Sequence, residues 1–381
     1  MLKVLWLCSW YPNKRAPFEG DFVQRHAQAA SLYHRIHVIK VTPDPEDLGV
    51  TFEQQQNTEY PNLTEEHIYY PKKPGVSGKL RSYFYWFHLY KKAVRRYISV
   101  YGKPDLVHVH IPFKSGLVAQ WIKKKYGIPY VVTEHWDGYN TVVDDNFYER
   151  PRWFRSIVRN TFHKATGFHS VSRYLVREIN QLGKEIPSVV IPNVADTRIF
   201  FKKQKERQQQ FRCVHISSGA PKKNIEGIIR AFGQLPASSF SLTVIGLEPR
   251  LNVAYKERYP WIRWIGVQPY NIVARELQEA DLLIVFSNAE NSPCVIGEAL
   301  CCGVPVVSSD VGGISELIND QNGLMIPAGD EAALVNAIRF VEAHYPDYNA
   351  TKIASDASTR FSYAVVGQQI DRWYQGLKNP S

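Results

Sequence analysis

The stretch from Asp281 to Ile318 constrains the fold of this chain more than any other. It begins with an apolar run, Leu282 to Phe286, that is too short for a helix and rich in branched residues, as expected of a buried parallel strand. A loop and a helix-like segment containing Glu298 follow, and a second apolar run covers Val304 to Ser308. This order of strand, helix and strand predicts an α/β fold with a parallel sheet.

Polar residues and glycines follow each of the two predicted strands. Glu290 lies in the loop after the first strand, and Gly312 and Gly313 follow the second, just before a segment in which we expect a helix to begin. Ligands of open parallel sheets bind beyond the carboxyl ends of the strands, so these residues should border a crevice. Exposed amides at a helix start suit a phosphate, and ionised carboxylates accept hydrogen bonds from sugar hydroxyls. The combination predicts a nucleotide-sugar site.

The order of these residues resembles the donor-site signature of retaining glycosyltransferase family 4. The resemblance is carried by Glu290, seven residues, Glu298, then Ala-Leu, Gly-Val-Pro-Val-Val and Gly-Gly-Ile-Ser-Glu-Leu-Ile. It implies the GT-B fold, in which two Rossmann-like doubly wound domains face a central cleft and a C-terminal helix crosses back to the first domain. It also implies a nucleotide diphosphate sugar as donor, UDP- or GDP-linked, retention of anomeric configuration, and neither a cofactor nor an obligatory metal.

The other hydrophobic segments fit two domains of this kind. Strand-like apolar runs alternate with helical patterns from Leu2 to Asn193 and again from Arg212 onward. We expect an acceptor-binding domain at 1–200, a nucleotide-sugar-binding domain at 201–360 and a returning helix at 361–381. The charged, glutamine-rich stretch Lys202 to Gln210 is the expected linker. Residues 43–78 are polar and contain prolines, and their pattern predicts no element.

The resemblance assigns donor-binding roles to residues of the signature. Glu298 should hold the ribose hydroxyls, and Glu290 should hold the transferred sugar. Backbone amides in the segment of Ser292, Pro293, Cys294 and Val295 are expected to bind the transferred sugar together with Glu290.

The expected diphosphate site departs from the family pattern at one position. Lys223 matches a lysine that binds the diphosphate in the family, but the arginine that usually precedes it is replaced by Ser218. Either Lys222 supplies the missing charge, or the diphosphate relies more on Lys223 and on the turn at Gly312 and Gly313.

The first domain is expected to contribute His135 and Gly20. His135 follows a predicted strand, and the resemblance places it beside the donor sugar near the reaction centre, which makes His135, Glu290 and Lys223 the candidate catalytic residues. Gly20 would approach the donor phosphates and the acceptor. His108 and His110 share one face of a neighbouring strand; we expect His108 to be structural and leave His110 open. No Cys, Asp or Glu stands at ligand spacing from them, so we predict no metal site.

Positive charge is concentrated in the first half of the chain. Residues 1–200 contain 28 Lys and Arg against 18 Asp and Glu, whereas residues 201–381 contain 18 of each. The segment Lys79 to Tyr101 mixes aromatic residues with bases at helical spacing, which predicts an amphipathic helix on an anionic membrane surface. The alternative is a helix that packs its aromatic face on the sheet and solvates its bases. The bases are Arg81, Lys91, Lys92, Arg95 and Arg96.

Together these patterns predict a glycosyltransferase that acts on a lipid-linked or cell-envelope glycan. We expect a cytoplasmic protein held peripherally on the inner face of the membrane, because no run of eighteen apolar residues and no signal-peptide pattern occurs. The five cysteines lack a Cys-x-x-Cys pair and are expected to be reduced. A nucleotide-sugar epimerase of the same fold and a non-enzymatic nucleic-acid or nucleotide-sugar binder remain alternatives, although we expect no nucleic-acid partner. A nicotinamide enzyme is disfavoured because no Gly-x-Gly-x-x-Gly follows the first strand.

Overall fold

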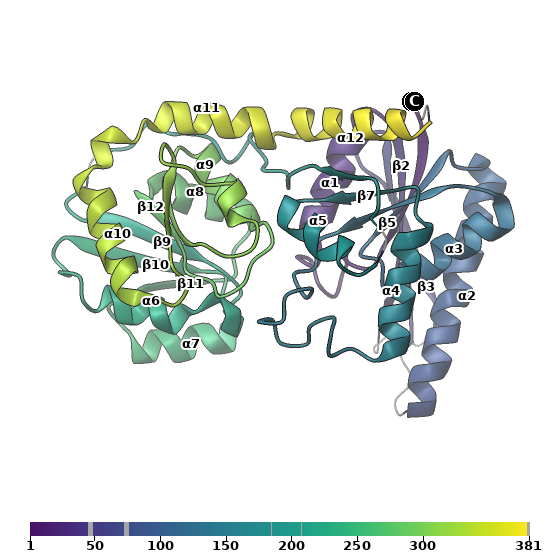
Figure 1. Ribbon diagram of the computed structural model, residues 1–381, viewed down its shortest axis with the longest axis horizontal. Helices are drawn as coiled ribbons and strands as arrows, with labels where there is room; N and C mark the ends of the chain where they lie inside the picture. The colour runs from purple at the N-terminus through teal and green to yellow at the C-terminus, as the bar shows by residue number, and fades with distance from the viewer. Residues whose placement is uncertain (45–48, 72–75, 184, 207, 379–381) are drawn as a thin grey trace.

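The computed structural model describes residues 1–378 except 45–48, 72–75, 184 and 207, and the side chains of 76–80 are also outside the described part. Two α/β halves lie side by side, and the helices α11 and α12 run along one edge of both (Figure 1). Each half contains one twisted sheet with helices on both faces, so the predicted pair of Rossmann-like domains is confirmed.

The first domain is built on an eight-stranded sheet with the order β3-β4-β2-β1-β5-β6-β7-β8. Neighbouring strands are parallel except β3 and β4, which pair antiparallel. Its elements are β1 (Lys3–Cys8), α1 (Asp21–Ser31), β2 (Arg35–Pro43), β3 (Thr51–Gln56), β4 (Leu63–Tyr70), α2 (Val76–Tyr101), β5 (Leu106–His110), α3 (Ser115–Tyr126), β6 (Tyr130–Glu134), α4 (Arg152–Lys164), β7 (Gly167–Ser170), α5 (Arg173–Asn180) and β8 (Ser188–Val190).

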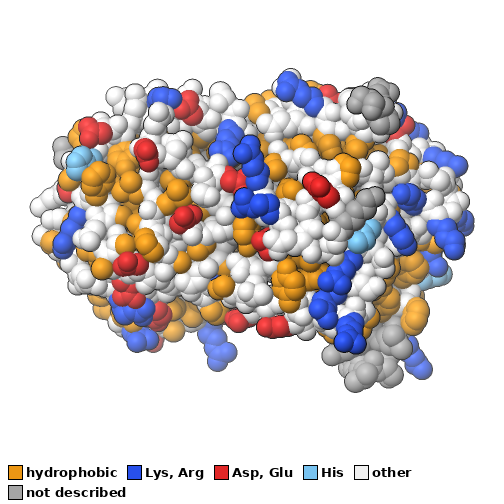
Figure 2. All heavy atoms as spheres, viewed as in Figure 1, with side chains coloured by type: hydrophobic (Ala, Val, Ile, Leu, Met, Phe, Trp, Pro, Cys, Tyr) orange, Lys and Arg blue, Asp and Glu red, His pale blue; other side chains and the backbone are white. Residues whose placement is uncertain are grey.

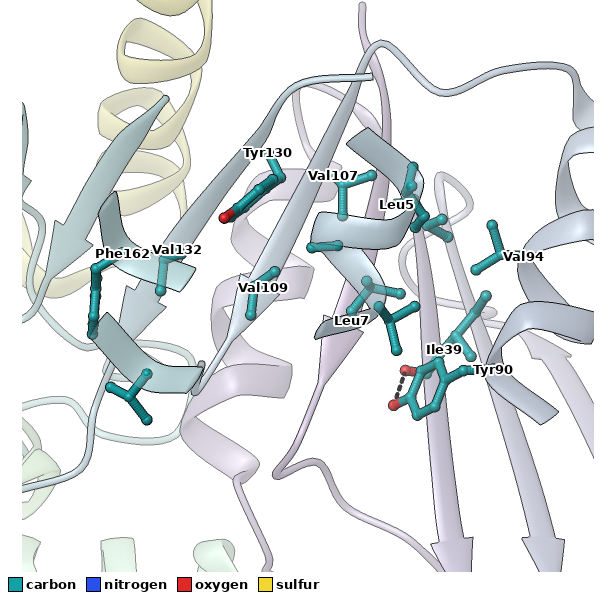
Figure 3. Close-up of a cluster of buried hydrophobic side chains, with 14 of the residues drawn as sticks. Leu5, Leu7, Ile39, Tyr90, Val94, Val107, Val109, Tyr130, Val132 and Phe162 are labelled. Atoms are coloured by element: carbon teal, nitrogen blue, oxygen red, sulfur yellow. Dashed lines mark hydrogen bonds between the residues drawn. The ribbon is translucent and has the colours of Figure 1, made fainter. Parts of the chain in front are cut away.

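The central strands of this sheet are buried on both faces, which explains their continuous apolar runs. One face packs on α2, where the ring of Tyr90 lies against Leu7 and Ile39 (Figure 3). The Tyr90 hydroxyl is buried and donates to the carbonyl of Ile39, with a separation of 3.2 Å, so its polar end is satisfied inside the core.

The second domain has a six-stranded parallel sheet with the order β11-β10-β9-β12-β13-β14. Its elements are β9 (Phe211–Ile216), the 3₁₀ turn η1 (Pro221–Lys223), α6 (Ile225–Phe232), β10 (Phe240–Ile245), α7 (Pro249–Arg258), β11 (Arg263–Gly266), α8 (Tyr270–Glu279), β12 (Leu282–Val285), α9 (Cys294–Cys301), β13 (Val306–Ser309), the 3₁₀ turn η2 (Ile314–Glu316), β14 (Gly323–Ile326), α10 (Glu331–Ala343), the 3₁₀ turn η3 (Tyr345–Asp347) and α11 (Ala350–Phe361).

The last helix, α12 (Tyr363–Lys378), packs on α1 of the first domain. A Cβ at Gly367 would lie 2.4 Å from the carbonyl oxygen of Ala29, so only glycine allows the two helices to come this close. The chain crosses between the domains at two adjacent places, because the amide of Ala195 donates to the carbonyl of Phe361 over 2.9 Å. The expected return of the C-terminal helix to the first domain is confirmed.

Several elements lie where the sequence predicts none. Residues 51–70 form the antiparallel pair β3 and β4, in a region without a clear pattern, and α7 and β14 are likewise additional. The prediction of a helix beginning after Gly313 is wrong: Ile314–Glu316 form a single 3₁₀ turn, after which the chain turns into β14. The five cysteines are free, and four are buried, as expected of core thiols.

Candidate active site

A cavity of about 300 Å³ lies between the two domains, beyond the carboxyl ends of β6 and β12. This position agrees with the rule that ligands of open α/β sheets bind beyond the strand ends. We call it the cleft cavity; its lining comes from both domains and consists of Trp10, Phe22, His135, Trp136, Asp137, Val171, Asn193, Lys222, Glu290, Asn291, Ser292, Pro293 and Cys294.

Glu290 is held in the wall of this cavity by a cation. The loop that follows β12 places it there, with only 5% of the residue exposed. Its Oε1 accepts from the ammonium of Lys223 in an ion pair and from the Ser287 hydroxyl over 2.7 Å. Among the described residues its other carboxylate oxygen makes no hydrogen bond. The structure thus brings together two of the three candidate catalytic residues and leaves one oxygen of Glu290 available.

Lys222 also faces the cleft, but its partner comes from the opposite domain. Its ammonium forms an ion pair with Asp137, three residues after the end of β6. Both residues line the cleft cavity. Lys222 therefore lines the cleft cavity, and Lys223 beside it contacts Glu290 in the cavity wall, close to where the usual arginine is replaced by Ser218.

Glu298 lies on α9 and is almost completely buried. Its Oε1 accepts from Nη1 of Arg25, on α1 of the first domain, over 2.7 Å. The second guanidinium nitrogen of Arg25 donates to Asp21 over 2.9 Å and to the Tyr270 hydroxyl over 3.2 Å. Burial raises the pKa of Glu298, while the positive charge of Arg25 opposes that shift. The carboxylate expected at the ribose is thus oriented by a side chain of the other domain.

The two glycines of the signature do not present a free helix start. The amide of Gly313 donates to the carbonyl of Asn291 over 3.0 Å, so it is already used. Gly312 has φ 60°, and a Cβ there would lie 1.7 Å from the carbonyl oxygen of Glu290. The expectation that Gly313 opens a helix onto the diphosphate is therefore corrected: these glycines allow the two loops to pack, and so fix the backbone that carries Glu290.

The helix start that does lie at the cavity is that of α9. Ser292, Pro293 and Cys294 line the cleft cavity, and α9 begins at Cys294. The first-turn amides of a helix have no intrahelical acceptor and carry partial positive charge. Val295 faces the core instead. Burial raises the pKa of the Cys294 thiol to about 12, so it stays neutral and leaves the positive potential of the helix start intact.

His135 lies in the cleft cavity with neither ring nitrogen hydrogen-bonded among the described residues. Its ring lies 4.7 Å from that of Phe22, 5.4 Å from that of His26 and 6.1 Å from that of His110, measured between centroids. Burial holds its pKa well below the usual range. A neutral imidazole with unused nitrogens at the cleft is consistent with the predicted contact to the donor sugar.

The neighbouring histidines differ in their contacts. His108 is hydrogen-bonded to the Tyr374 hydroxyl over 2.5 Å and to Thr133, which supports its expected structural role. His110 is fully buried, stacks on Trp6 at 4.0 Å between centroids, and has both ring nitrogens unpaired among the described residues.

Gly20 is buried and precedes α1 with φ 66°. A Cβ there would lie 2.6 Å from the backbone of Trp10, so glycine is required for the loop to close on itself. Its position shapes the wall that Trp10 contributes to the cleft cavity.

The five basic residues expected on an amphipathic helix all lie on α2, and none of them lines the cleft cavity. The helix buries Trp86, Tyr90 and Tyr97 against the sheet and leaves Phe84 64% exposed.

The bases of α2 differ in their surroundings. Arg96 pairs with Glu66 over 2.7 Å. Arg81, Lys92 and Arg95 are exposed, and Lys91 is half-buried. On the face shown in Figure 2, Lys and Arg side chains gather over the first domain. The packing alternative thus accounts for part of the aromatic face, and the start of the segment, Lys79, lies outside the described side chains.

Sequence reasoning missed Arg25, which binds Glu298, and Asp21 and Tyr270, which bind Arg25. A signal was present, since Arg25 shares one face of α1 with Phe22, His26 and Ala29 at helical spacing, and a charged residue on the face that packs inward is unusual. A buried arginine requires a partner, but the sequence could not show that the partner lies in the other domain.

Two features are absent from the described ranges. No group of three or more His, Cys, Asp or Glu is arranged to hold a metal ion there. No helix in that part of the chain combines the length and the apolar character needed to cross a bilayer.

Two family models match consecutive parts of the chain. The model described as Glycosyltransferase Family 4 matches residues 25–199, and the model described as Glycosyl transferases group 1 matches residues 196–356. The boundary between the matches coincides with the crossing at Ala195.

Curated relatives are similar over most of their length. TuaC of Bacillus subtilis, which is provisionally assigned as a glycosyltransferase of teichuronic acid biosynthesis, is 26% identical over 88% of each chain. The N-acetyl-alpha-D-glucosaminyl L-malate synthase of Bacillus anthracis is 23% identical over 67% of this chain and 74% of its own.

Solved structures of glycosyltransferases share the fold. Sucrose-phosphate synthase from Thermosynechococcus elongatus superposes with a TM-score of 0.79 at 19% identity, covering both chains completely. HepE of Anabaena, solved in complex with UDP, superposes with a TM-score of 0.73 at 20% identity, over 98% of this chain and 100% of its own. Of the alternatives considered, these matches support the transferase. The chain therefore belongs to the family 4 type of glycosyltransferases with the GT-B fold.

Proposed function

We propose that this glycosyltransferase transfers a sugar, with retention of anomeric configuration, from a UDP- or GDP-linked donor to a hydroxyl of a lipid-linked or cell-envelope glycan. The observation that carries the proposal is the ion pair of Lys223 with Glu290 in the wall of the cleft. It places an ammonium suited to a diphosphate beside a carboxylate suited to sugar hydroxyls. HepE, which shares the fold, was solved with UDP and with UDP-glucose, and the name of TuaC points to an envelope polymer.

The diphosphate would lie against Lys223, Lys222 and the start of α9. In the structure each lysine is paired with a carboxylate, Lys223 with Glu290 and Lys222 with Asp137. A diphosphate carries more charge than either carboxylate, so we expect its arrival to draw both ammonium groups away and to release Glu290 for the sugar. Fixed positive charge where the leaving group develops negative charge lowers the barrier without a metal.

The two glutamates would then hold the two ends of the donor. Glu298 keeps one oxygen on Arg25 and has the other for the ribose hydroxyls, while Glu290 accepts from hydroxyls of the transferred sugar. His135 would contact that sugar from the first domain, with Gly20 shaping the loop at its side.

Retention is expected to follow a front-face route through an oxocarbenium-like state. The oxygen of the acceptor hydroxyl forms a bond to the anomeric carbon, and the bond from that carbon to the diphosphate oxygen breaks with its electron pair on the diphosphate. The hydroxyl proton passes to that departing oxygen. Glu290 is tied to Lys223 and Ser287, which suits hydrogen bonding more than attack on the anomeric carbon. A covalent sugar adduct on Glu290 or His135, detected by mass spectrometry of trapped enzyme, would overturn this route.

The donor can be identified by incubating the protein with UDP-, GDP- and ADP-sugars. Native mass spectrometry should show one donor bound, and acceptor-dependent release of its nucleotide should follow. The coupling constant of the anomeric proton in the product distinguishes retention from inversion. Failure of both the UDP-sugars and the GDP-sugars to bind would contradict the proposal.

We also propose peripheral attachment to the inner face of the cell membrane through α2. The exposed Phe84 and Tyr85 lie on the same helix as the exposed Arg81, Lys92 and Arg95. Each base near an anionic surface contributes about 1 kcal/mol. Sedimentation with anionic vesicles should exceed sedimentation with neutral ones, and Phe84→Ser should reduce it. Equal absence of binding to both kinds of vesicle would refute the attachment.

A further inference from the structure

The imidazole of His135 lies in the cleft without a hydrogen bond to orient it. Neither ring nitrogen has a partner in the described part of the chain, and the ring packs beside Phe22 and His26, with centroids 4.7 and 5.4 Å away. A side chain without hydrogen bonds takes its position from its own backbone and from packing. The contacts that fix the backbone of His135 therefore decide where its imidazole stands in the cleft.

The amide side of this backbone is held by Glu134, the last residue of β6, which is 1% exposed. Its Oε1 accepts from the amides of His135 and Trp136, over 2.8 and 2.9 Å. Its Oε2 accepts from the Tyr139 hydroxyl over 2.7 Å. A buried ionisable group is costly unless it is hydrogen-bonded, and these three bonds satisfy the carboxyl group. The strand thus ends in a side chain that anchors the first two residues of the loop after it.

The carbonyl side is held from the other domain, by Asn291. This residue directly follows Glu290 in the loop after β12, is 5% exposed and lines the cleft cavity. Its Nδ2 donates to the carbonyl of His135 over 3.3 Å. Its Oδ1 accepts from the hydroxyl of Ser172 in the first domain over 2.5 Å, and its own carbonyl accepts from the amide of Gly313 over 3.0 Å. The side-chain amide of Asn291 therefore has a partner at each end, and both partners belong to the first domain.

The close approach of these segments depends on Gly313. A Cβ at this position would lie 2.4 Å from the carbonyl oxygen of Asn291 and 2.7 Å from the Cβ of Ser172. A residue with a side chain would therefore push Asn291 away from the first domain. The glycine thus permits the contact between Asn291 and the backbone of His135.

We propose that Glu134 and Asn291 are positioning residues that hold the backbone of His135 from both sides and so set its imidazole against the sugar that Glu290 binds. Asn291 and Glu290 are adjacent in the chain, so the carboxylate from one domain and the imidazole from the other are linked through a single residue. Such placement matters because an error of about 1 Å can cost about 100-fold in rate. The inference rests on the proposed function for the contact of His135 with the sugar, and it adds the two residues that place it.

Kinetics with the donor found by the nucleotide-sugar screen test the positioning role. We expect Asn291→Ala to lower kcat roughly 10- to 100-fold. Its affinity for UDP or GDP without a sugar should stay the same, because the proposed nucleotide contacts, Glu298 and Lys223, remain in place. Glu134→Ala should act in the same way. Glu134→Gln keeps an acceptor oxygen for the two amides and should retain most of the activity.

A matched control makes the same change away from the cleft. Asn319 lies on an exposed loop of the second domain, and its side chain accepts from the amide of Gln321 over 2.9 Å. Asn319→Ala therefore also removes one bond between a side chain and the backbone, and it should alter neither kcat nor nucleotide affinity.

A double-mutant cycle shows whether Asn291 acts through His135. In the His135→Ala background, Asn291→Ala should lower kcat no further, since the group that it positions is gone. Independent losses would mean that Asn291 contacts the substrate itself or only stabilises the fold, and they would overturn the inference. It would also be overturned by an unchanged kcat in Asn291→Ala or Glu134→Ala, or by a loss of UDP and GDP affinity equal to the loss in kcat.

Hydrogen exchange followed by mass spectrometry tests the contacts without a donor. Asn291→Ala and Glu134→Ala should each speed exchange of the amides of His135 and Trp136, while exchange in β12 stays slow, as an intact fold requires. Unchanged exchange in both variants would overturn the inference even if activity falls. Failure of the UDP- and GDP-sugars to bind the unmodified protein would instead contradict the proposed function, and the exchange measurement would still decide whether these two residues hold His135.

Discussion

Nη1 of Arg25 lies 2.7 Å from Oε1 of Glu298, so a buried ion pair joins the first domain to the carboxylate that we place at the donor ribose. The same guanidinium lies 4.8 Å from the ring centroid of Tyr270 on the second domain and donates to the carbonyl of Val194 over 3.0 Å. The ion pair that orients Glu298 is therefore also a contact between the two domains, while Asp21 and Val194 hold Arg25 from its own domain.

We expect Arg25→Gln to lower stability and to raise the donor KM together. Removing one partner of a buried ion pair leaves the other charge uncompensated, at a cost of about 3–5 kcal/mol. Urea unfolding measures the stability, and initial-rate kinetics measure the donor KM. The Arg25→Gln/Glu298→Gln double variant should lose less than the sum of the single losses, since both act through one contact. Additive losses would show that the two residues work independently.

Glu298→Ala should raise the donor KM steeply and change kcat less, because the ribose contact is made in the ground state as well as in the transition state. The sharper measurement uses a donor that lacks the 2′-hydroxyl of the ribose. The unmodified enzyme should bind this donor less tightly than the ordinary one, whereas Glu298→Ala should bind the two donors with equal affinity. Glu342→Ala, on the exposed face of α10, is the control. Unchanged kinetics in Glu298→Ala would contradict the ribose assignment.

Lys223→Gln should lower kcat/KM by roughly 10- to 100-fold, the loss expected from one charge-assisted contact of about 1.5–3 kcal/mol to the departing diphosphate. Lys223→Arg keeps the charge with a different shape and should retain part of the activity. Steady-state kinetics with the identified donor distinguish the two variants. Equal activity of Lys223→Gln and the unmodified enzyme would place the diphosphate elsewhere.

The sequence was most informative where local pattern and chemistry coincide. The runs at Leu282 and Val304 predict buried parallel strands, and both are found, because strands buried on both faces must be apolar throughout. The strand β4 could not be found in this way: Glu65 and Glu66 are buried in it, and their partners, Tyr11 and His37, lie far away in sequence.

In the candidate active site, too, the features that follow from local pattern were predicted and those that follow from distant contacts were not. The strand and glycine context of Glu290 and Glu298, rather than their spacing alone, predicts that both carboxylates lie at the cleft, and the structure has both at the boundary between the domains. The sequence could not give the role of Gly313. Its amide donates to the carbonyl of Asn291, and this contact depends on how two loops meet. Contacts between domains, such as that of Arg25, follow from tertiary packing, which no local pattern encodes.

Stability should fall as the pH decreases from 7.5 to 5.5. Burial lowers the pKa of His26 to about 4 and of His169 to about 3, and lowers those of His34, His67, His108, His110, His135 and His215 as well. Below their usual value of about 6.5 the unfolded chain binds protons that the folded protein does not, which favours unfolding by up to about 1.4 kcal/mol per pH unit for each histidine.

Four buried or half-buried carboxyl groups, Glu134, Glu178, Asp196 and Glu298, act in the opposite direction, because burial raises the pKa of each. Burial raises the pKa of Glu134 to about 7, so between its usual value and pH 7 the folded protein binds a proton that the unfolded chain does not. Eight histidines outnumber these four carboxyls, so the net slope keeps its sign. Thermal unfolding across this range checks it. His110→Phe, which removes one titrating group that has no hydrogen bond among the described residues, should give a shallower dependence. A melting temperature that rises on acidification would refute the expectation.

Glu316 joins the domains at a second point, and its loss should let them separate. Its two carboxylate oxygens accept from the backbone amides of Arg173 and Tyr174, over 2.8 and 2.9 Å, while the hydroxyl of Ser172 accepts from the third amide, that of Leu175. A residue of the second domain thus completes the cap of α5 in the first. Glu316→Ala should cost about 0.5–2 kcal/mol in urea unfolding, the usual range for a lost cap, and should increase the radius of gyration measured by small-angle X-ray scattering. Glu342→Ala should change neither quantity. Because the cap exists only in the closed arrangement, a Glu316→Ala protein that keeps both its stability and its scattering profile would show that other contacts alone hold the cleft closed.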